Sequence, residues 1–171
     1  MLDMRQAAER VLFLAEKKKL KDVDIVVERN ESLDLEIQDG KVEKVEQSTS
    51  LGLGVRVLDQ GRTGLASTER LSSEAIELAF KNACENAKLQ DHTKVIMLDA
   101  PTEIPDSLLL DLHNPELDHL NLEQLKELGF SIEDSVKAGD KRVVSIPYLG
   151  VSRGRNESLL LSSRGVSYTQ H

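Results

Sequence analysis

The sequence predicts an α+β fold in which an antiparallel β-meander is covered by helices. Three observations support this class. Apolar residues recur every three or four positions in three separate segments, they alternate with polar residues over a long stretch between the first two, and an Asp-Gly pair interrupts that alternation. At 171 residues, the chain is also long enough to bury a core without disulfide bonds.

The first helix is expected at residues 3–20. Asp3 can cap its N-terminus, and one face carries the apolar residues Met4, Ala7, Ala8, Val11, Leu12 and Ala15. A period of two then runs through residues 23–67, which predicts four antiparallel strands with one apolar face. Asp39-Gly40 is typical of a two-residue hairpin turn with positive φ, and this turn would place Ile37 opposite Val42.

A second turn is predicted at Asp59-Gln60-Gly61. These residues fit a three-residue hairpin loop in which Gly61 takes the left-handed conformation. That loop length sets Val55 opposite Leu65 and Arg56 opposite Gly64.

Two further helices are expected to cover the sheet. The helix at residues 72–89 starts at the cap Ser72, and its face of small and apolar residues would lie close on the strands. Burial alone then predicts a helix-sheet-helix sandwich. The helix at 121–138 starts at Asn121, has a capping-box Gln124, and carries an apolar stripe of Leu125, Leu128, Ile132 and Val136.

The expected organisation is an α+β domain at residues 1–90, an extended linker at 91–120 and a C-terminal part at 121–171. Pro101, Pro105 and Pro115 punctuate the linker. The C-terminal part should add the 121–138 helix and three short strands, with turns near 154–156 and 163–165. Since the last strand would end without a partner, we expect it to be the truncated start of a larger C-terminal region.

Composition excludes several classes of function. The formal net charge of −8 and pI of about 5.1 argue against direct binding of nucleic acid or an anionic membrane. Aromatic residues make up only 3% of the chain, too few for a platform on which bases stack. The one cysteine, the lack of a long apolar run and the charged N-terminus favour a cytoplasmic protein.

The glycine-rich stretch at residues 49–68 is not a phosphate-binding loop. Gly52 and Gly54 are followed by a strand rather than by a helix, and no lysine follows any of these glycines as a P-loop requires. The next helix begins near Ser72, too far away for its N-terminus to face a bound phosphate. The glycines are therefore interpreted as turn and strand residues.

No catalytic, cofactor-binding or metal-binding residue is assigned from the sequence. His113 and His119 are the first and last residues of "HNPELDH", which is either a loop metal site or a solvated loop before a helix. No G-x-S-x-G motif occurs, and Cys84 falls on the apolar face of a helix, where packing is its expected role. The sheet edges either accept an extended peptide as an added strand or are covered by the linker or a partner chain.

The order of motifs over residues 24–88 resembles the N-terminal region of the TldD/PmbA family, once described as modulators of DNA gyrase. The segment contains a strand, a strand ending in DG-K, "GLGVRV", "GRTGLAST" and a Ser-Glu-Ala helix. "LDAPTEI", the 121–138 helix, "GDKRVVSI" and "SSRGVSY" continue the resemblance, which is stronger to the PmbA (TldE) branch. The matched positions are Gly40, Gly52, Gly54, Arg56, Gly61, Gly64 and Gly165.

The resemblance implies a cytoplasmic zinc metallopeptidase assembly that processes unfolded or modified peptides. In that family a TldD-type subunit carries the zinc in an HExxxH motif, and a PmbA-type subunit completes the cavity around it. The motif belongs to a C-terminal region outside these 171 residues, so the resemblance implies zinc for the intact assembly and none for this fragment. The implied partners are a TldD-like subunit or a second copy, together with extended peptide substrates, and neither DNA nor a membrane.

Three hypotheses follow from the sequence. The first is a non-catalytic N-terminal domain of a PmbA-like subunit that shapes the cavity of such an assembly. The second is a stand-alone peptide-binding or protein-binding module with no proteolytic role. The third is an enzyme that uses "HNPELDH" as a metal loop.

Overall fold

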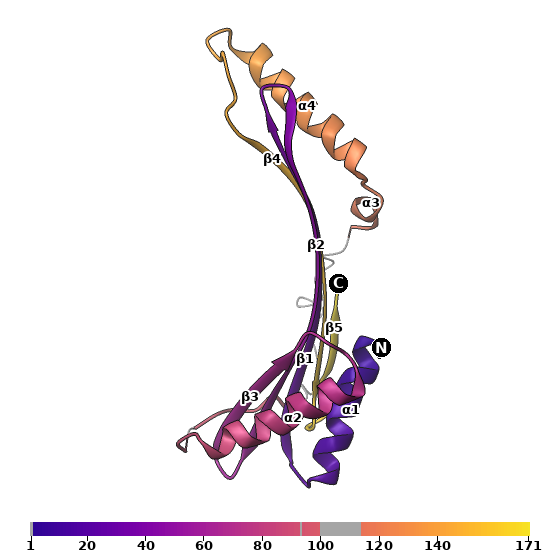
Figure 1. Ribbon diagram of the computed structural model, residues 1–171, viewed down its shortest axis with the longest axis vertical. Coiled ribbons are helices and arrows are strands. Elements are labelled where there is room, and N and C mark those ends of the chain that lie inside the picture. The colour runs from indigo at the N-terminus through magenta and orange to yellow at the C-terminus, as the bar shows by residue number, and fades with distance from the viewer. Residues whose placement is uncertain (1, 93, 100–113) are drawn as a thin grey trace. The chain divides into compact units, whose positions relative to one another are not determined.

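The computed structural model describes residues 2–92, 94–99 and 114–171 and confirms the α+β class (Figure 1). Five antiparallel strands form one sheet in the order β3-β2-β1-β4-β5. The elements in chain order are α1 (Met4–Lys17), β1 (Asp22–Gln38), β2 (Lys41–Asp59), β3 (Arg62–Thr68), α2 (Ser73–Lys88), α3 (Pro115–Asp118), α4 (Leu122–Gly139), β4 (Leu149–Ser162) and β5 (Ser167–Gln170).

The chain divides into two compact units, and three strands contribute to both. The first unit contains Met1–Arg29, Ser50–Leu110 and Asn156–His171, and the second contains Asn30–Thr49 and Asp111–Arg155. Half of the segment predicted as a linker, namely residues 93 and 100–113, lies outside the described residues. Where it is described again, Asn114 caps the short helix α3.

All three predicted helix caps are present. Asp3 forms a capping box with Gln6 at the start of α1, and Asn121 forms one with Gln124 at the start of α4. The Ser72 hydroxyl accepts a hydrogen bond from the Ala75 N–H at the start of α2. The side chains that begin these helices thus satisfy N–H groups that have no partner inside the helix.

The predicted four-stranded meander is instead three strands, because β1 and β2 are long. Each runs without interruption through polar stretches that contain no apolar alternation, such as exposed residues 43–50 in β2. Backbone hydrogen bonds between strands do not require apolar side chains, so a strand can continue where its sequence pattern stops. The predicted Asp39-Gly40 turn is confirmed, since both residues have positive φ.

The turn between β2 and β3 has two residues rather than the three predicted. Gln60 and Gly61 both have positive φ, which is the type I′ geometry, so the left-handed Gly61 is confirmed and Gln60 joins it. Asp59 pairs with Arg62, and the predicted register is therefore wrong by one residue. Val55 lies opposite Ala66, and Arg56 lies opposite Leu65.

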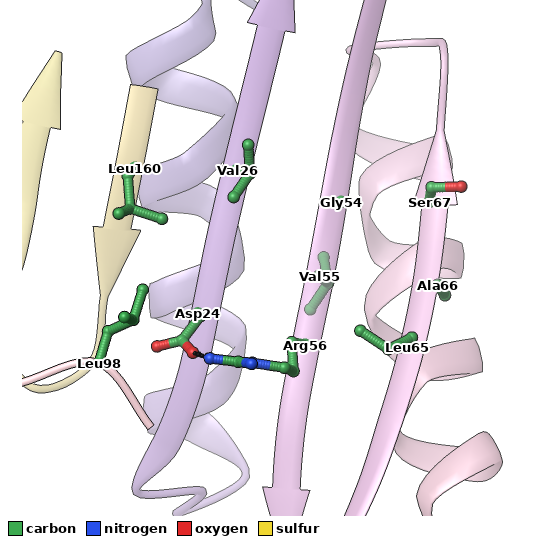
Figure 2. A pocket seen from close by; sticks show the side chains of 10 residues that line it. All are labelled: Asp24, Val26, Gly54, Val55, Arg56, Leu65, Ala66, Ser67, Leu98 and Leu160. Atoms are coloured by element: carbon green, nitrogen blue, oxygen red, sulfur yellow. Dashed lines mark hydrogen bonds and ion pairs between the residues drawn. The ribbon is translucent and has the colours of Figure 1, made fainter. Parts of the chain in front are cut away.

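The core of the first unit lies on one face of the sheet only. Both α1 and α2 cover this face, so the predicted helix-sheet-helix sandwich is wrong for the described residues, and Figure 2 shows both helices behind the strands. The buried strand residues Val23, Ile25, Val27, Leu53, Val55 and Val57 pack against small helix residues such as Ala8, Ala83 and Ala87. Each fully buried Val or Ile side chain contributes roughly 1.5–3 kcal/mol.

The second unit has a small core of its own, in which α4 packs on β1 and β4. Its buried residues are Leu35, Ile37, Leu125 and Val151, and Val42 is partly buried against them. The predicted stripe of α4 is only partly buried, because Leu128, Ile132 and Val136 are exposed. The helix instead turns Gly129 toward Ile37, where an added Cβ would come within 2.3 Å of the Ile37 Cδ1.

The C-terminal residues form two strands of the same sheet. β4 passes through residues 154–156 without the predicted turn, whereas the turn at 163–165 is confirmed and contains Gly165 with positive φ. The last strand was expected to lack a partner, but β5 pairs with β4 from Ser158↔Gln170 to Leu161↔Ser167. β3 and β5 are therefore the two edges of the sheet.

Candidate functional site

The face of the sheet opposite α1 and α2 carries a cavity of about 720 Å³ within the first unit. We call it the sheet groove. Its floor is formed by β1 and β2, one wall by β3, and the other by Leu98 and Leu160 (Figure 2). The volume is in the range of small-molecule and peptide sites. The lining residues are Asp24, Val26, Gly54, Val55, Arg56, Leu65, Ala66, Ser67, Leu98 and Leu160.

An ion pair lies in the floor of the sheet groove. The Arg56 Nε donates a hydrogen bond of 2.9 Å to the Asp24 Oδ2, and Nη2 donates to the same oxygen. The Asp24 side chain is only 5% exposed, and its Oδ1 accepts no hydrogen bond from any described residue. A buried oxygen without a partner is costly unless another molecule satisfies it.

The wall formed by Leu98 is held in place by the C-terminal turn. The Ser162 hydroxyl donates a hydrogen bond to the Leu98 carbonyl oxygen. Arg164 binds both Asp22 and Asp99, at 2.7 and 2.8 Å. The two carboxylates raise the pKa of the Arg164 guanidinium, which is charged at physiological pH and holds the residues on both sides of it together.

The glycines singled out from the sequence have three different surroundings. Gly40, Gly61 and Gly165 take positive φ in turns. A Cβ added to Gly64 would lie 1.9 Å from the Ala83 carbonyl oxygen, so the backbone that approaches this glycine is that of α2. Gly52 and Gly54 are open, and Gly54 lies in the floor of the sheet groove.

The other candidates from the sequence do not assemble into a site among the described residues. Within residues 2–92, 94–99 and 114–171, no group of three His, Cys, Asp or Glu side chains could hold a metal ion. His113 of "HNPELDH" lies outside the described residues, whereas Asn114 caps α3. Cys84 is buried, and burial raises the pKa of its thiol, which disfavours the reactive thiolate.

A second cavity of about 390 Å³ lies in the second unit, beside β1, β2 and β4. Two of its charged side chains, Lys44 and Glu46, are exposed and paired with each other, since the Lys44 Nζ lies 2.6 Å from the Glu46 Oε2. This hydrogen bond raises the pKa of Lys44 and lowers the pKa of Glu46. Because no buried group there lacks a partner, the sheet groove is the stronger candidate.

Sequence reasoning did not identify the Asp24–Arg56 pair. Arg56 was singled out only among the positions of the family resemblance, and Asp24 was read as one polar residue in an alternating strand. The opposite charges of these two residues could have indicated an ion pair. That inference requires the pairing of β1 with β2, which the sequence pattern does not determine.

Comparison with known protein families matches one segment of the chain. Residues 23–87, which include both members of the ion pair, match a sequence profile described as PmbA/TldA metallopeptidase domain 1. Residues 23–87 therefore carry the first domain of the TldD/PmbA family. No curated protein matched the chain.

Solved structures show the same fold. A protein from Thermotoga maritima described as a modulator of a DNA gyrase aligns with a TM-score of 0.84 and 18% identity, over 97% of this chain and 36% of its own. TldE from Thermococcus kodakarensis aligns with a TM-score of 0.76 and 19% identity, over 96% of this chain and 36% of its own. A protein from Bacteroides thetaiotaomicron, also described as a modulator of DNA gyrase, aligns with a TM-score of 0.81 and 19% identity, over 99% of this chain and 39% of its own.

The present chain thus spans well under half the length of these solved structures. At identities below 20%, the alignments establish the fold and leave the activity open. None of the described helices is long and apolar enough to cross a membrane.

Proposed function

We propose that this chain is the non-catalytic N-terminal domain of a PmbA-like subunit in a cytoplasmic zinc metallopeptidase assembly. In this proposal a TldD-like subunit, or a second copy of the full-length chain, completes the assembly. The domain lines the space through which unfolded or modified peptides reach the catalytic centre. The observation that carries the proposal is the match of residues 23–87 to the first domain of a metallopeptidase family.

The features of the first unit agree with a binding role. The sheet groove offers apolar walls and a partly buried ion pair but no nucleophile with an adjacent base. The two edge strands, β3 and β5, offer backbone groups to which an extended chain could add. The proposal therefore assigns zinc and catalysis to another part of the assembly and peptide contacts to this domain.

Affinity purification of the tagged full-length protein from its native host tests the proposal. The expected result is a stoichiometric TldD-like subunit with zinc, and peptide hydrolysis by the complex that a chelator abolishes. The matched control is the same purification with an unrelated tagged protein. A full-length chain that carries its own HExxxH motif after residue 171 would show that the non-catalytic assignment is wrong.

The competing function is a stand-alone binding module. It is favoured by one observation, which is that the sheet groove is formed entirely by residues of the first unit. Purification of the full-length chain without any peptidase subunit, but with peptides bound to it, would support this alternative over the assembly.

A further inference from the structure

The sheet groove contains one polar group that the rest of the described chain leaves unsatisfied. Asp24 is 95% buried, and its two oxygens have different surroundings, because Oδ2 accepts from Arg56 whereas Oδ1 has no partner among the described residues. In Figure 2 one Asp24 oxygen faces Arg56, and the other points toward Leu98 on the opposite wall. A ligand that donates at this position makes a hydrogen bond that no described residue supplies.

The groove also offers hydrogen-bond donors beside this acceptor. The Arg56 guanidinium carries five N–H groups, and its contact with Asp24 uses Nε and Nη2. The side chain is 31% exposed, so its remaining N–H groups can reach a molecule in the groove. Asp24 and Arg56 therefore present an acceptor and a donor side by side.

Apolar side chains surround this pair. Val26 lies on the floor, Leu65 and Leu98 are on opposite walls, and Leu160 lies beside Leu98. Leu65 is 62% exposed, so its side chain is accessible to a molecule in the groove. A ligand that complements the groove must carry apolar groups on both sides of a unit that donates and accepts hydrogen bonds.

We infer that the sheet groove binds an extended peptide segment through the backbone of one residue, whose N–H donates to the Asp24 Oδ1 and whose carbonyl oxygen accepts from Arg56, because both groups of an extended residue point to the same side. The apolar side chains of the neighbouring residues lie against Leu65 on one wall and Leu98 and Leu160 on the other. The choice of a peptide, rather than another apolar amide, rests on the proposed function. The groove recognises the backbone and apolar bulk, so it would accept many sequences.

Gly54 provides a test that does not disturb the ion pair. It lies on the floor of the groove, its φ is not positive, and the nearest heavy atom to an added Cβ is the Val26 carbonyl oxygen at 4.0 Å. A Cβ at this position thus meets nothing closer than 4.0 Å, and the substitution Gly54→Val places a branched side chain in the groove. Gly52→Val is the matched control, because Gly52 lies two residues away in the same strand, outside the groove, with nothing within 4 Å.

The experiment titrates acetyl-Leu-Ala-Leu-amide into the full-length protein and its variants, with binding followed by NMR. The wild type and Gly52→Val should bind alike, and Gly54→Val should bind about tenfold more weakly or worse, since the branched side chain occupies the position of the ligand. The same peptide with methylated backbone nitrogens should lose affinity to a similar degree, because it cannot donate to Asp24.

Three results would overturn the inference. They are equal affinity of Gly54→Val and Gly52→Val, equal affinity for the methylated peptide, and no binding to the wild type at millimolar peptide. The substitution Leu65→Lys repeats the test at the wall formed by β3 and should weaken peptide binding. Its control is Leu78→Lys on the exposed face of α2, which should leave peptide binding unchanged. Since no zinc, peptidase subunit or hydrolysis enters these measurements, the inference can fail while the proposed assembly stands, and the reverse also holds.

Discussion

The contact between α2 and β3 at Gly64 supports a quantitative prediction for Gly64→Ala. An added Cβ would lie 1.9 Å from the Ala83 carbonyl oxygen, 2.5 Å from the Ala87 nitrogen and 2.9 Å from the Ala87 Cβ. Two of these three atoms are backbone, so a change of side-chain rotamer cannot relieve the clash. Ordinary contacts begin near 3.4 Å, so α2 must retreat by about 1.5 Å at this point.

A retreat of this size loosens the main core. A gap of 0.5–1 Å already loses roughly a quarter to a half of the dispersion energy between packed atoms, and overpacked cores typically lose about 1–3 kcal/mol. Because the obstructing atoms belong to the helix backbone, we expect about 3 kcal/mol of destabilisation by Gly64→Ala. In urea this lowers the midpoint of unfolding by about 1 M or more.

Far-UV circular dichroism during urea unfolding is the appropriate assay, because the chain has no tryptophan to report by fluorescence. Gly52→Ala is the control, because its added Cβ meets nothing within 4 Å and its φ is not positive. It should be neutral or stabilise by up to about 1 kcal/mol through the unfolded state. If Gly64→Ala and Gly52→Ala unfolded at the same urea concentration, the close packing of α2 on β3 would be refuted.

Three further predictions concern a turn, an ion pair and the thiol. Gly61→Val should cost about 1–2 kcal/mol or more, because a β-branched residue resists positive φ; an unchanged melting temperature would contradict the turn geometry. The pKa of Lys137 is raised by its hydrogen bond to buried Glu133, so this contact should stabilise the fold below the ordinary lysine pKa. That stability should be lost as the pH rises through the raised pKa of Lys137, and Glu133→Gln should lose less stability over the same pH range. If the wild type and Glu133→Gln gave the same alkaline unfolding curve, the contribution of this contact would be refuted. Cys84 should react with a thiol reagent only when the protein unfolds, and fast labelling of the native protein would show that it is not buried.

The helices and their starts could be predicted from the sequence because their causes are local. Asp3, Ser72 and Asn121 cap the N–H groups of their own first turns, and each is followed at once by apolar residues at helical spacing. The side of α4 that becomes buried could not be predicted in this way. Gly129 and Glu133 face inward, because the glycine allows close approach to Ile37 and the glutamate accepts a hydrogen bond from the Gly40 N–H.

The sheet groove could not be predicted because it depends on a single residue of register. The expected three-residue loop placed only Gly61 in the left-handed conformation. A non-glycine residue such as Gln60 rarely adopts positive φ, yet Gln60 does so here. A shift of one residue moves every side chain of a strand to the other face. The observed register places Leu65 beside Arg56 on the open face, where it becomes a wall of the groove.

Hydrolysis of an unstructured apolar peptide by the reconstituted assembly tests the central claim most directly. The TldD-like subunit would be mixed with zinc and with the full-length form of this chain, as wild type, Gly54→Val or Gly52→Val. The account predicts that hydrolysis requires both subunits, and that Gly54→Val lowers kcat/KM about tenfold whereas Gly52→Val leaves it unchanged. Hydrolysis that proceeds at the same rate without this chain, or with Gly54→Val in place of the wild type, would contradict it.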